Sequence, residues 1–448
     1  MSKRKSFSDK VFVSLKNKIA RLDQLKVVNH LVNDTECDFT RNRKLHFPDV
    51  VMFILSMAGC PIREELLEYF DYDINTATAS AFVQARAKVL PEAFEQLLHL
   101  FNKAYPCAET YKGYRLIAVD GSNLNIPYDP QDLTTFHRNQ NNACSLYHIN
   151  AAYDILNNRY VDMVIQGNAN KYEQKAMWIM AERFPTSKTI FIADRNYPTW
   201  NNMEHIIRSG KYFLIRTKDI HSSSSLLRKF NLPDSEFDLD IKTTLTTKQT
   251  SDVRLHPEKY RFLSTSSTFD FFDAGNPFYD VSYRVVRFKL EGTEDYECII
   301  TNLPRNEFGP AEIKELYHLR WQEEISFRHL KYSADLSAVH ARKRSSILQE
   351  IWARAILYNF SFVIIRELAK RRAKKKRKYE YVINKTRAIH LIRDLLMKRK
   401  GGSSPPDLEG LISNEILPLR PGRSDPRKVR AQSVISSTIA FLKQHHYN

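Results

Sequence analysis

The spacing of apolar residues predicts helices throughout residues 1–106. Apolar side chains recur roughly every 3.6 positions in VFVSLKNKIARL, FPDVVMFILSM and PEAFEQLLHLF, which is the period of an amphipathic helix. Within this region IREELLEYF, a DYDIN turn and TATASAFVQARAKVL are typical of a helix-turn-helix. We expect its second helix to present Gln84, Arg86 and Lys88 on the exposed side. The alternative is an ordinary helical hairpin with a solvated basic face.

From Tyr114 the pattern changes to short apolar strands that alternate with helices. YRLIAVD predicts a strand that ends on Asp120, before the turn-rich GSNLNIP, and SLYHINAAYDI and YVDMVIQG predict a hairpin. KYEQKAMWIMAERF is helical, TIFIAD is a strand that ends on Asp194, and a helix and the strand KYFLIRTK follow. The order is three strands, helix, strand, helix, strand. This is the order of a ribonuclease-H-like α/β domain, with an acid at the end of its first and fourth strands.

Taken with the rest of the sequence, these patterns predict an α/β protein with a ribonuclease-H-like core and helical regions at both ends. We expect a first part of the core at 107–217, a β-rich insertion at 218–304 and a second, helical part of the core at 305–372. Residues 1–106 and 373–448 form the two flanking helical regions. The basic run KRRAKKKRK at 370–378 and a GGSSPP linker from residue 401 mark the C-terminal one.

The charge of the chain points to a polyanionic partner. Lys and Arg number 68 against 51 Asp and Glu, which gives a net charge of +17, and nucleic acid is the first candidate for its partner. Gln84, Arg86 and Lys88 are therefore candidates for reading DNA. The 43% of hydrophobic residues excludes global disorder. The longest apolar run is too short to span a membrane, and no signal peptide is evident, so we expect a cytoplasmic protein without membrane association.

The five scattered cysteines form no metal-binding or disulfide pattern, and no phosphate-binding glycine loop is present. The most informative segment is YHLRWQEEISFRHLK at 317–331. On a helix its polar residues share a strip about 100° wide, namely Tyr317, Arg320, Trp321, Glu324, Arg328 and Lys331. An apolar face lies at roughly 200–280° and is expected to be buried. The geometry alone leaves open a surface strip of salt bridges between residues four apart.

The spacing of this segment resembles one group of bacterial insertion-sequence transposases that carry a DDE triad. The group is marked by Tyr, two residues, Arg, three residues, Glu, six residues and Lys, as at 317–331 here. AVDGS at 118–122 and ADRNY at 193–197 resemble the segments of its two aspartates. The resemblance implies that Asp120, Asp194 and Glu324 are the catalytic and metal-binding triad. Glu323 competes for the third position, but only Glu324 keeps the spacing.

The resemblance also implies the substrate and the cofactor. Residues matching Tyr317, Arg320 and Lys331 hold phosphates near the cleaved transposon end, and Trp321 and Arg328 extend that DNA-binding surface. Two Mg²⁺ ions, for which Mn²⁺ substitutes, suit carboxylate ligands and phosphoryl transfer.

The resemblance further implies cut-and-paste transposition in the bacterial nucleoid. It involves a hairpin intermediate and a synaptic homodimer on terminal inverted repeats and target DNA. Two rivals are an inactive transposase-derived DNA-binding protein and a metal-dependent nuclease on the same fold.

Overall fold

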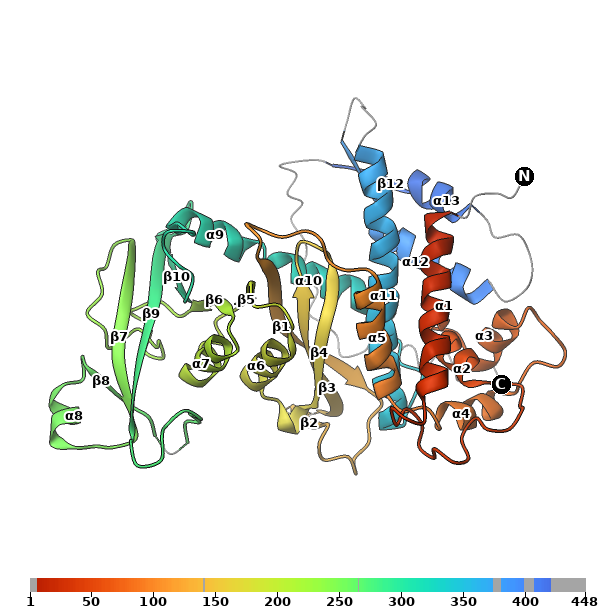
Figure 1. Cartoon of the computed structure of the whole chain (residues 1–448), viewed down its shortest axis with the longest axis horizontal. Coiled ribbons are helices and arrows are strands. Elements are labelled where there is room, and N and C mark those ends of the chain that lie inside the picture. The colour runs from red at the N-terminus through yellow and green to blue at the C-terminus, as the bar shows by residue number, and fades with distance from the viewer. Residues whose placement is uncertain (1–5, 140–141, 265, 374–379, 399–406, 420–448) are drawn as a thin grey trace.

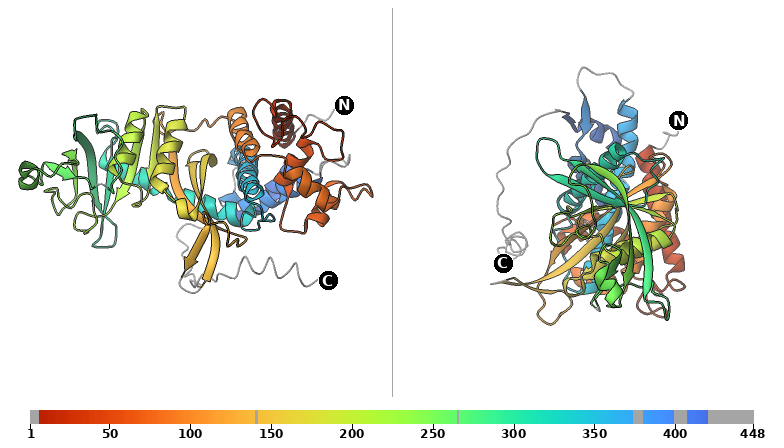
Figure 2. Two further views of the ribbon diagram at one scale, coloured as in Figure 1. Left: turned by 90° about the horizontal axis from the view of Figure 1, so that it is seen from below. Right: turned by 90° about the vertical axis from the view of Figure 1, so that its left-hand side faces the viewer.

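The computed structural model describes residues 6–139, 142–264, 266–373, 380–398 and 407–419. The elongated molecule has helices from both ends of the chain at one end, a sheet in its middle, and β7–β9 at the other end (Figure 1, Figure 2). These three strands are β7 (Phe237–Thr246), β8 (Tyr260–Phe262) and β9 (Phe278–Lys289). None of the helices in the described parts of the chain has both the length and the apolar character needed to span a bilayer.

The helical end is organised around one long buried helix. α11 (Arg344–Ala373) is buried almost continuously from residue 351 to 365, as expected of a helix that is apolar on all sides. It contacts α1, α2 and α5 of the N-terminal region and α12 of the C-terminal region. The helices that precede the sheet are α1 (Phe7–Leu25), α2 (Phe47–Ser56), α3 (Ile62–Tyr69), α4 (Ala79–Arg86) and α5 (Glu92–Ala104).

The C-terminal elements lie against the same helical end. They are β11 (Tyr381–Ile383), α12 (Lys385–Lys398), α13 (Leu408–Asn414) and β12 (Ile416–Pro418). The expected basic run at 370–378 is described only to residue 373, where α11 ends, so its residues 374–378 lie outside the described residues, as does most of the expected linker from 401.

One ten-stranded sheet forms the middle and the far end of the molecule. Its order is β2-β3-β1-β5-β6-β10-β9-β7-β8, with β4 paired to β3. The pairs β1–β5 and β5–β6 are parallel, whereas β1–β3, β3–β4, β6–β10 and β10–β9 are antiparallel. The strands not yet bounded are β1 (Arg115–Ile126), β2 (Phe136–Asn139), β3 (Asn142–Asp154), β4 (Arg159–Gly167), β5 (Thr189–Ala193), β6 (Tyr212–Thr217) and β10 (Tyr296–Thr301).

Two hydrophobic cores cover the two faces of this sheet. Alternate residues of β1 point to opposite faces, so Leu116 and Ala118 join the core that contains α11, whereas Ile117 and Val119 join the other core. The second core packs α6 (Glu173–Arg183) and α7 (Trp200–Arg208) onto the sheet. The predicted order of three strands, helix, strand, helix and strand is present, with the short β2 and the 3₁₀ turn η1 (Asn168–Asn170) added.

Two local predictions are wrong. β1 does not end at Asp120: it continues to Ile126, because GSNLNI pairs with β3 along its whole length, up to Ile126 opposite Ser145. The segment at 317–331 is also not one regular helix. It divides into α9 (Pro310–His318), α10 (Trp321–Arg328) and the π-helical turn η2 (His329–Ser333). Between α9 and α10 the backbone tightens, because the amides of Arg320 and Gln322 donate to carbonyls three residues back.

The β-rich stretch belongs to the same sheet as the strands before it. β10 pairs with β6 on one side and with β9 on the other, and β9 pairs with β7. A short helix, α8 (Ser251–Leu255), lies between β7 and β8.

Candidate active site

The two predicted aspartates lie next to each other at the end of β5. In the parallel pair β1–β5, Val119 is opposite Ala193, so Asp120 and Asp194 are the next residues on adjacent strands. Adjacent strands are about 4.8 Å apart. Asp120 follows Ala118 by two positions and therefore faces the core that contains α11. The Asp194 carboxylate accepts a hydrogen bond from the backbone amide of Asn196, 2.9 Å away, which fixes the turn after β5.

The third predicted acid comes from α10, which contacts β1 (Figure 1). The Arg320 guanidinium donates to the Glu324 carboxylate at 2.9 Å. Arg320 is 6% exposed, whereas the Glu324 side chain is 37% exposed, so a buried cation holds a carboxylate that remains open to solvent. The two residues are four apart, as in the alternative of a salt-bridged strip that the sequence left open, and they stay paired although the segment is not one regular helix.

The acids share one electrostatic environment. Burial raises the pKa of Asp120 from 3.8 to about 6; the Gly121 amide and Arg320 oppose the shift, and the negative charges of Asp194 and Glu324 add to it. The acids therefore lie close enough to influence one another. Groups of this kind, buried and coupled to like charges, are common at metal and catalytic sites.

Lys331 is held near Asp120 by two later residues of β1, the strand that carries Asp120. The Lys331 ammonium donates to the Ser122 hydroxyl at 2.6 Å and to the Asn123 carbonyl at 3.0 Å. Burial lowers its pKa, and the charge of Asp120 opposes that shift. The unexpected extension of β1 beyond Asp120 supplies both of these partners.

The other residues of the predicted strip differ in exposure. Tyr317 is 2% exposed, whereas Trp321 is 53% exposed and Arg328 is also exposed. The Arg320 guanidinium lies 5.3 Å from the Trp321 ring centre and 5.8 Å from that of Tyr317, so it is sandwiched by aromatic surface. Tyr317 is thus part of the support under Arg320, and Trp321 and Arg328 are open to a partner.

Two polar groups at this site were not assigned a role from the sequence. Glu323 is 0% exposed, neither of its carboxylate oxygens has a hydrogen-bond partner of regular geometry, and the only donor that acts on it is the backbone amide of Asp120. The Tyr197 hydroxyl is likewise buried without a partner. Burial, and then the charge of Asp120, raise the pKa of both groups well above its usual value. The sequence does indicate that Glu323 is buried, because on the helical projection this residue falls at about 240°, within the apolar face.

The residues fit a divalent cation by the chemistry of their donors. Asp120, Asp194 and Glu324 offer carboxylate oxygens, which Mg²⁺ prefers, and the buried oxygens of Glu323 have no regular hydrogen bond among the described residues. The carboxylate oxygens of Asp120, Asp194 and Glu324 do not all lie within 4.8 Å of one another. Among the described residues, only Glu95, His99 and Asp162 bring three potential ligand atoms within 4.8 Å of one another. Coordination by the triad therefore requires side-chain rotation, which the long Glu324 side chain allows.

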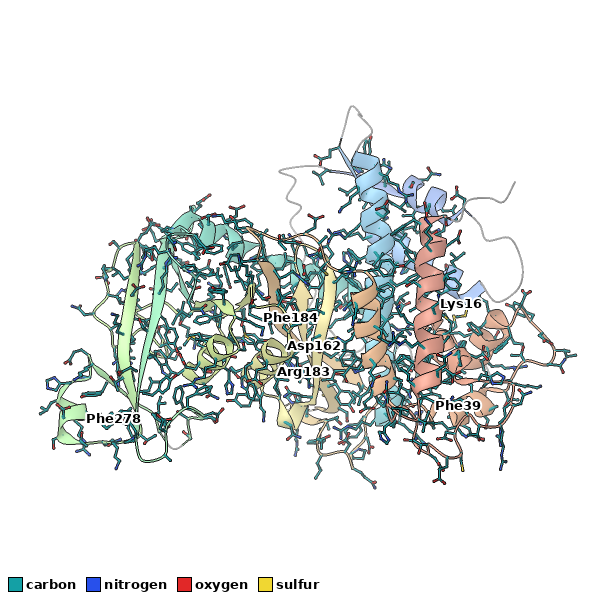
Figure 3. All side chains as sticks on the ribbon, viewed as in Figure 1. Lys16, Phe39, Asp162, Arg183, Phe184 and Phe278 are labelled. Atoms are coloured by element: carbon teal, nitrogen blue, oxygen red, sulfur yellow. The ribbon has the colours of Figure 1, made fainter. Side chains whose placement is uncertain are left out.

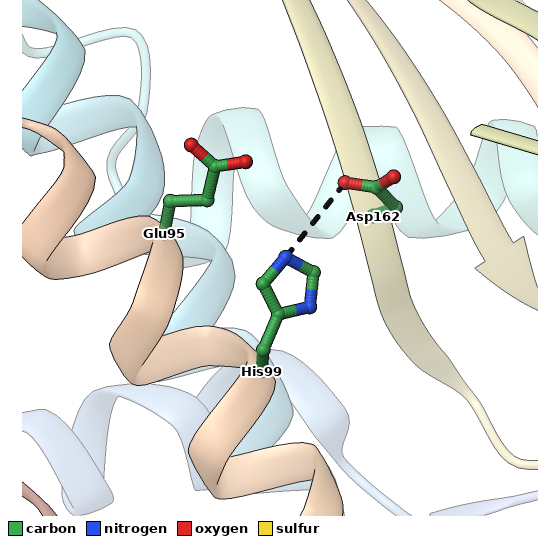
Figure 4. Close-up of side chains that lie close together, drawn as sticks. All are labelled: Glu95, His99 and Asp162. Carbon is green, nitrogen blue, oxygen red and sulfur yellow. Dashed lines mark ion pairs between the residues drawn. The ribbon is translucent and has the colours of Figure 1, made fainter. Parts of the chain in front are cut away.

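The cluster of Glu95, His99 and Asp162 lies elsewhere, between α5 and β4 (Figure 4). The Arg183 guanidinium lies 3.8 Å from Glu95 and 3.7 Å from Asp162 (Figure 3). Burial raises the pKa of Asp162 to about 6 and lowers that of His99. Because Arg183 already places a positive charge between the two carboxylates, we assign this cluster a structural role.

The expected DNA-reading helix is only partly exposed. The prediction for Arg86 is wrong: this residue is 3% exposed, and its guanidinium pairs with Glu350 of α11 at 2.8 Å and donates to Gln349 at 2.9 Å. α4 ends at Arg86, so Lys88 lies in the turn that follows, where it pairs with Asp38 at 2.8 Å. Gln84 is exposed, as expected.

A basic groove of about 910 Å³ runs between α4 and the loop that precedes α2. Gln84 and Lys88 line it from one side, and Arg41, Arg43 and Lys44 line it from the other. Arg41 and Arg43 are exposed. The hydrophobic pattern gives no indication that Arg41, Arg43 and Lys44 line a groove, so the sequence did not predict their role.

Comparison with known proteins identifies similarities in sequence and in structure. The family model described as a transposase DDE domain matches residues 111–360, more than half of the chain. A cryo-EM structure of a piggyBac transposase synaptic complex with hairpin DNA is similar to this chain with a TM-score of 0.42 and 10% identity. That match covers 93% of this chain and 87% of the other. No curated protein sequence matches.

Proposed function

The chain belongs to the family of transposases with a DDE domain, enzymes that act on DNA, and from this premise we propose that it moves an insertion sequence by metal-dependent cleavage and joining of DNA strands. The observation that carries the proposal is the meeting of Asp120, inside β1, with Asp194, just after the end of the adjacent strand β5, beneath the α10 helix that carries Glu324. We propose these three residues as the catalytic triad.

We further propose that the core is ribonuclease-H-like and that its two parts are residues 107–217 and 305–372. The sheet order β4-β3-β1-β5-β6, with β5 and β6 parallel to β1, supports this assignment, as does the position of α6 and α7 between successive strands. Residues 218–304 are then an insertion that extends the core sheet through β10.

Each residue of the site has a part that follows from its contacts. Asp120, Asp194 and Glu324 would hold divalent cations, which in such sites supply activation of the attacking oxygen and charge relief on the leaving 3′ oxygen. Mg²⁺ is proposed, with Mn²⁺ as its substitute. Arg320 orients Glu324 through their hydrogen bond. Lys331, fixed by Ser122 and Asn123, places a positive charge where a DNA phosphate can approach Asp120.

The same surface offers contacts to the rest of the DNA. Trp321 and Arg328 are exposed on α10 beside Glu324 and can meet bases and phosphates. The groove lined by Arg41, Arg43 and Lys44 is proposed to hold the DNA backbone in the N-terminal region. We also propose that the protein acts on terminal inverted repeats through a hairpin intermediate. It would do so as a synaptic homodimer in the bacterial nucleoid.

The proposal is tested by incubating the purified protein with a duplex that carries the inverted repeats flanking its gene. Products formed with Mg²⁺ or with EDTA are resolved on a denaturing gel. We expect Mg²⁺-dependent nicking at the repeat boundary followed by a hairpin. Binding without cleavage would instead indicate an inactive DNA-binding protein, and cutting at random positions would indicate a nuclease.

A further inference from the structure

The carboxyl group of Glu323 occupies an unusual position at the centre of the site. It is fully buried, neither oxygen has a hydrogen-bond partner of regular geometry, and the only donor that acts on it is the backbone amide of Asp120. A buried carboxylate without a charged partner is strongly disfavoured. A side chain placed there for packing alone would be apolar, as are Phe327 and Leu330 on the same face of the segment.

The surroundings of Glu323 are those of the proposed catalytic acids. α10 packs on β1, and Asp120 is the charged residue that disfavours ionisation of Glu323 most, followed by an opposing effect of Arg320 and a further contribution from Glu324. Among the described residues, Arg320 is the cation that contacts one of these acids, through its hydrogen bond to Glu324. Lys331 contacts Ser122 and Asn123 of β1 and acts on Asp120 only through its charge.

The direction of Glu323 differs from that of Glu324 because adjacent helical residues are about 100° apart. Glu324 lies at the flank of α10, with a side chain that is 37% exposed and bound to Arg320. Glu323 points inward to β1. The two glutamates thus approach the Asp120 region from two directions, one from the solvent side and one from within the core.

We propose that Glu323 is a fourth carboxylate of the cation site, which binds a divalent ion together with Asp120 from the buried side. This inference rests on the proposed function, because it concerns the same cations. A bound divalent ion would give the Glu323 oxygens a cationic partner, which none of the described residues provides.

The test measures cation binding directly, without DNA and without turnover. Mn²⁺ is titrated into the full chain by isothermal calorimetry for the wild type, Glu323→Gln, Glu324→Gln and the control Glu315→Gln. Glu315 lies on α9 and is exposed. We expect Glu323→Gln and Glu324→Gln each to weaken Mn²⁺ binding at least roughly tenfold, because the loss of even an outer partner weakens metal sites about 10- to 100-fold. Glu315→Gln should bind as the wild type does.

Folding is followed in parallel by thermal unfolding with and without Mn²⁺. Glu323→Gln keeps the shape of the side chain and removes its charge. Without Mn²⁺ its melting temperature should be no lower than that of the wild type, and Mn²⁺ should raise its melting temperature less than it raises that of the wild type. Glu323→Leu should behave in the same way, which keeps the test valid if the amide packs poorly. Wild-type affinity in both Glu323 variants, with weak binding in Glu324→Gln, would overturn this inference and leave the triad intact. A wild type that binds no Mn²⁺ would overturn the metal-dependent function as well.

Discussion

The histidine at position 340 makes the stability of the helical end depend on pH. His340 lies between η2 and α11, with its imidazole nitrogens 3.5 Å from Glu65 of α3 and 3.7 Å from Glu350 of α11. Burial by itself lowers the pKa of this imidazole, but the two carboxylates outweigh burial and raise the pKa from 6.5 to about 9. The charged imidazole therefore joins α3 to α11.

The size of the effect follows from this shift. Because the pKa is higher in the folded protein, the stabilisation is complete below about pH 6.5 and is lost as the pH rises through about 9. Raising the pKa from 6.5 to about 9 corresponds to about 3.5 kcal/mol when the imidazole is fully charged, of which about 3 kcal/mol remains at pH 6.5. His340→Gln removes the titrating group and keeps a hydrogen-bonding side chain.

Urea unfolding monitored by circular dichroism measures this contribution. The free energies of unfolding of the wild type and His340→Gln are compared at about pH 6.5 and about pH 9.5. The difference between the two proteins should shrink by about 3 kcal/mol at the higher pH. Other groups that titrate in this range contribute equally to both proteins and cancel. A difference that is the same at both pH values would refute the assignment of a charged His340.

Two further predictions concern the N-terminal region. Arg86→Ala should lower the free energy of unfolding by about 3 kcal/mol, because it removes the closer of the two cationic partners of the buried Glu350 and leaves only His340, 3.7 Å away. The exposed control Gln84→Ala should leave the melting temperature unchanged, and an equally stable Arg86 variant would contradict the buried pair. Arg43→Ala should weaken DNA binding and reduce the slope of log affinity against log salt concentration by about 0.9, the value for one phosphate contact. An unchanged slope would show that Arg43 in this groove does not contact the DNA backbone.

The elements with strong local patterns could be predicted from the sequence. The order from β1 to β6 is visible in the alternation of short apolar strands with amphipathic helices, and both aspartates stand where β5 ends. The pairing of Arg320 with Glu324 also follows from spacing alone, because residues four apart remain neighbours even where the helix is interrupted.

The features that escaped prediction depend on partners distant in the sequence. β1 extends past Asp120 because β3 pairs with it, and this pairing is invisible in the turn-rich letters of GSNLNIP. Arg86 is buried because Glu350, on a helix far along the chain, neutralises it. A basic residue on a short helix carries the same local pattern whether its partner is DNA or a buried glutamate.

The central claim is that Asp120, Asp194 and Glu324 together perform metal-dependent strand cleavage. The most direct measurement compares Asp120→Asn, Asp194→Asn and Glu324→Gln with the wild type, both for cleavage of repeat-end DNA with Mg²⁺ and for binding of the same DNA by gel shift. The account predicts that each substitution abolishes cleavage and leaves binding intact. Cleavage at the wild-type rate by any one of the three variants would contradict it.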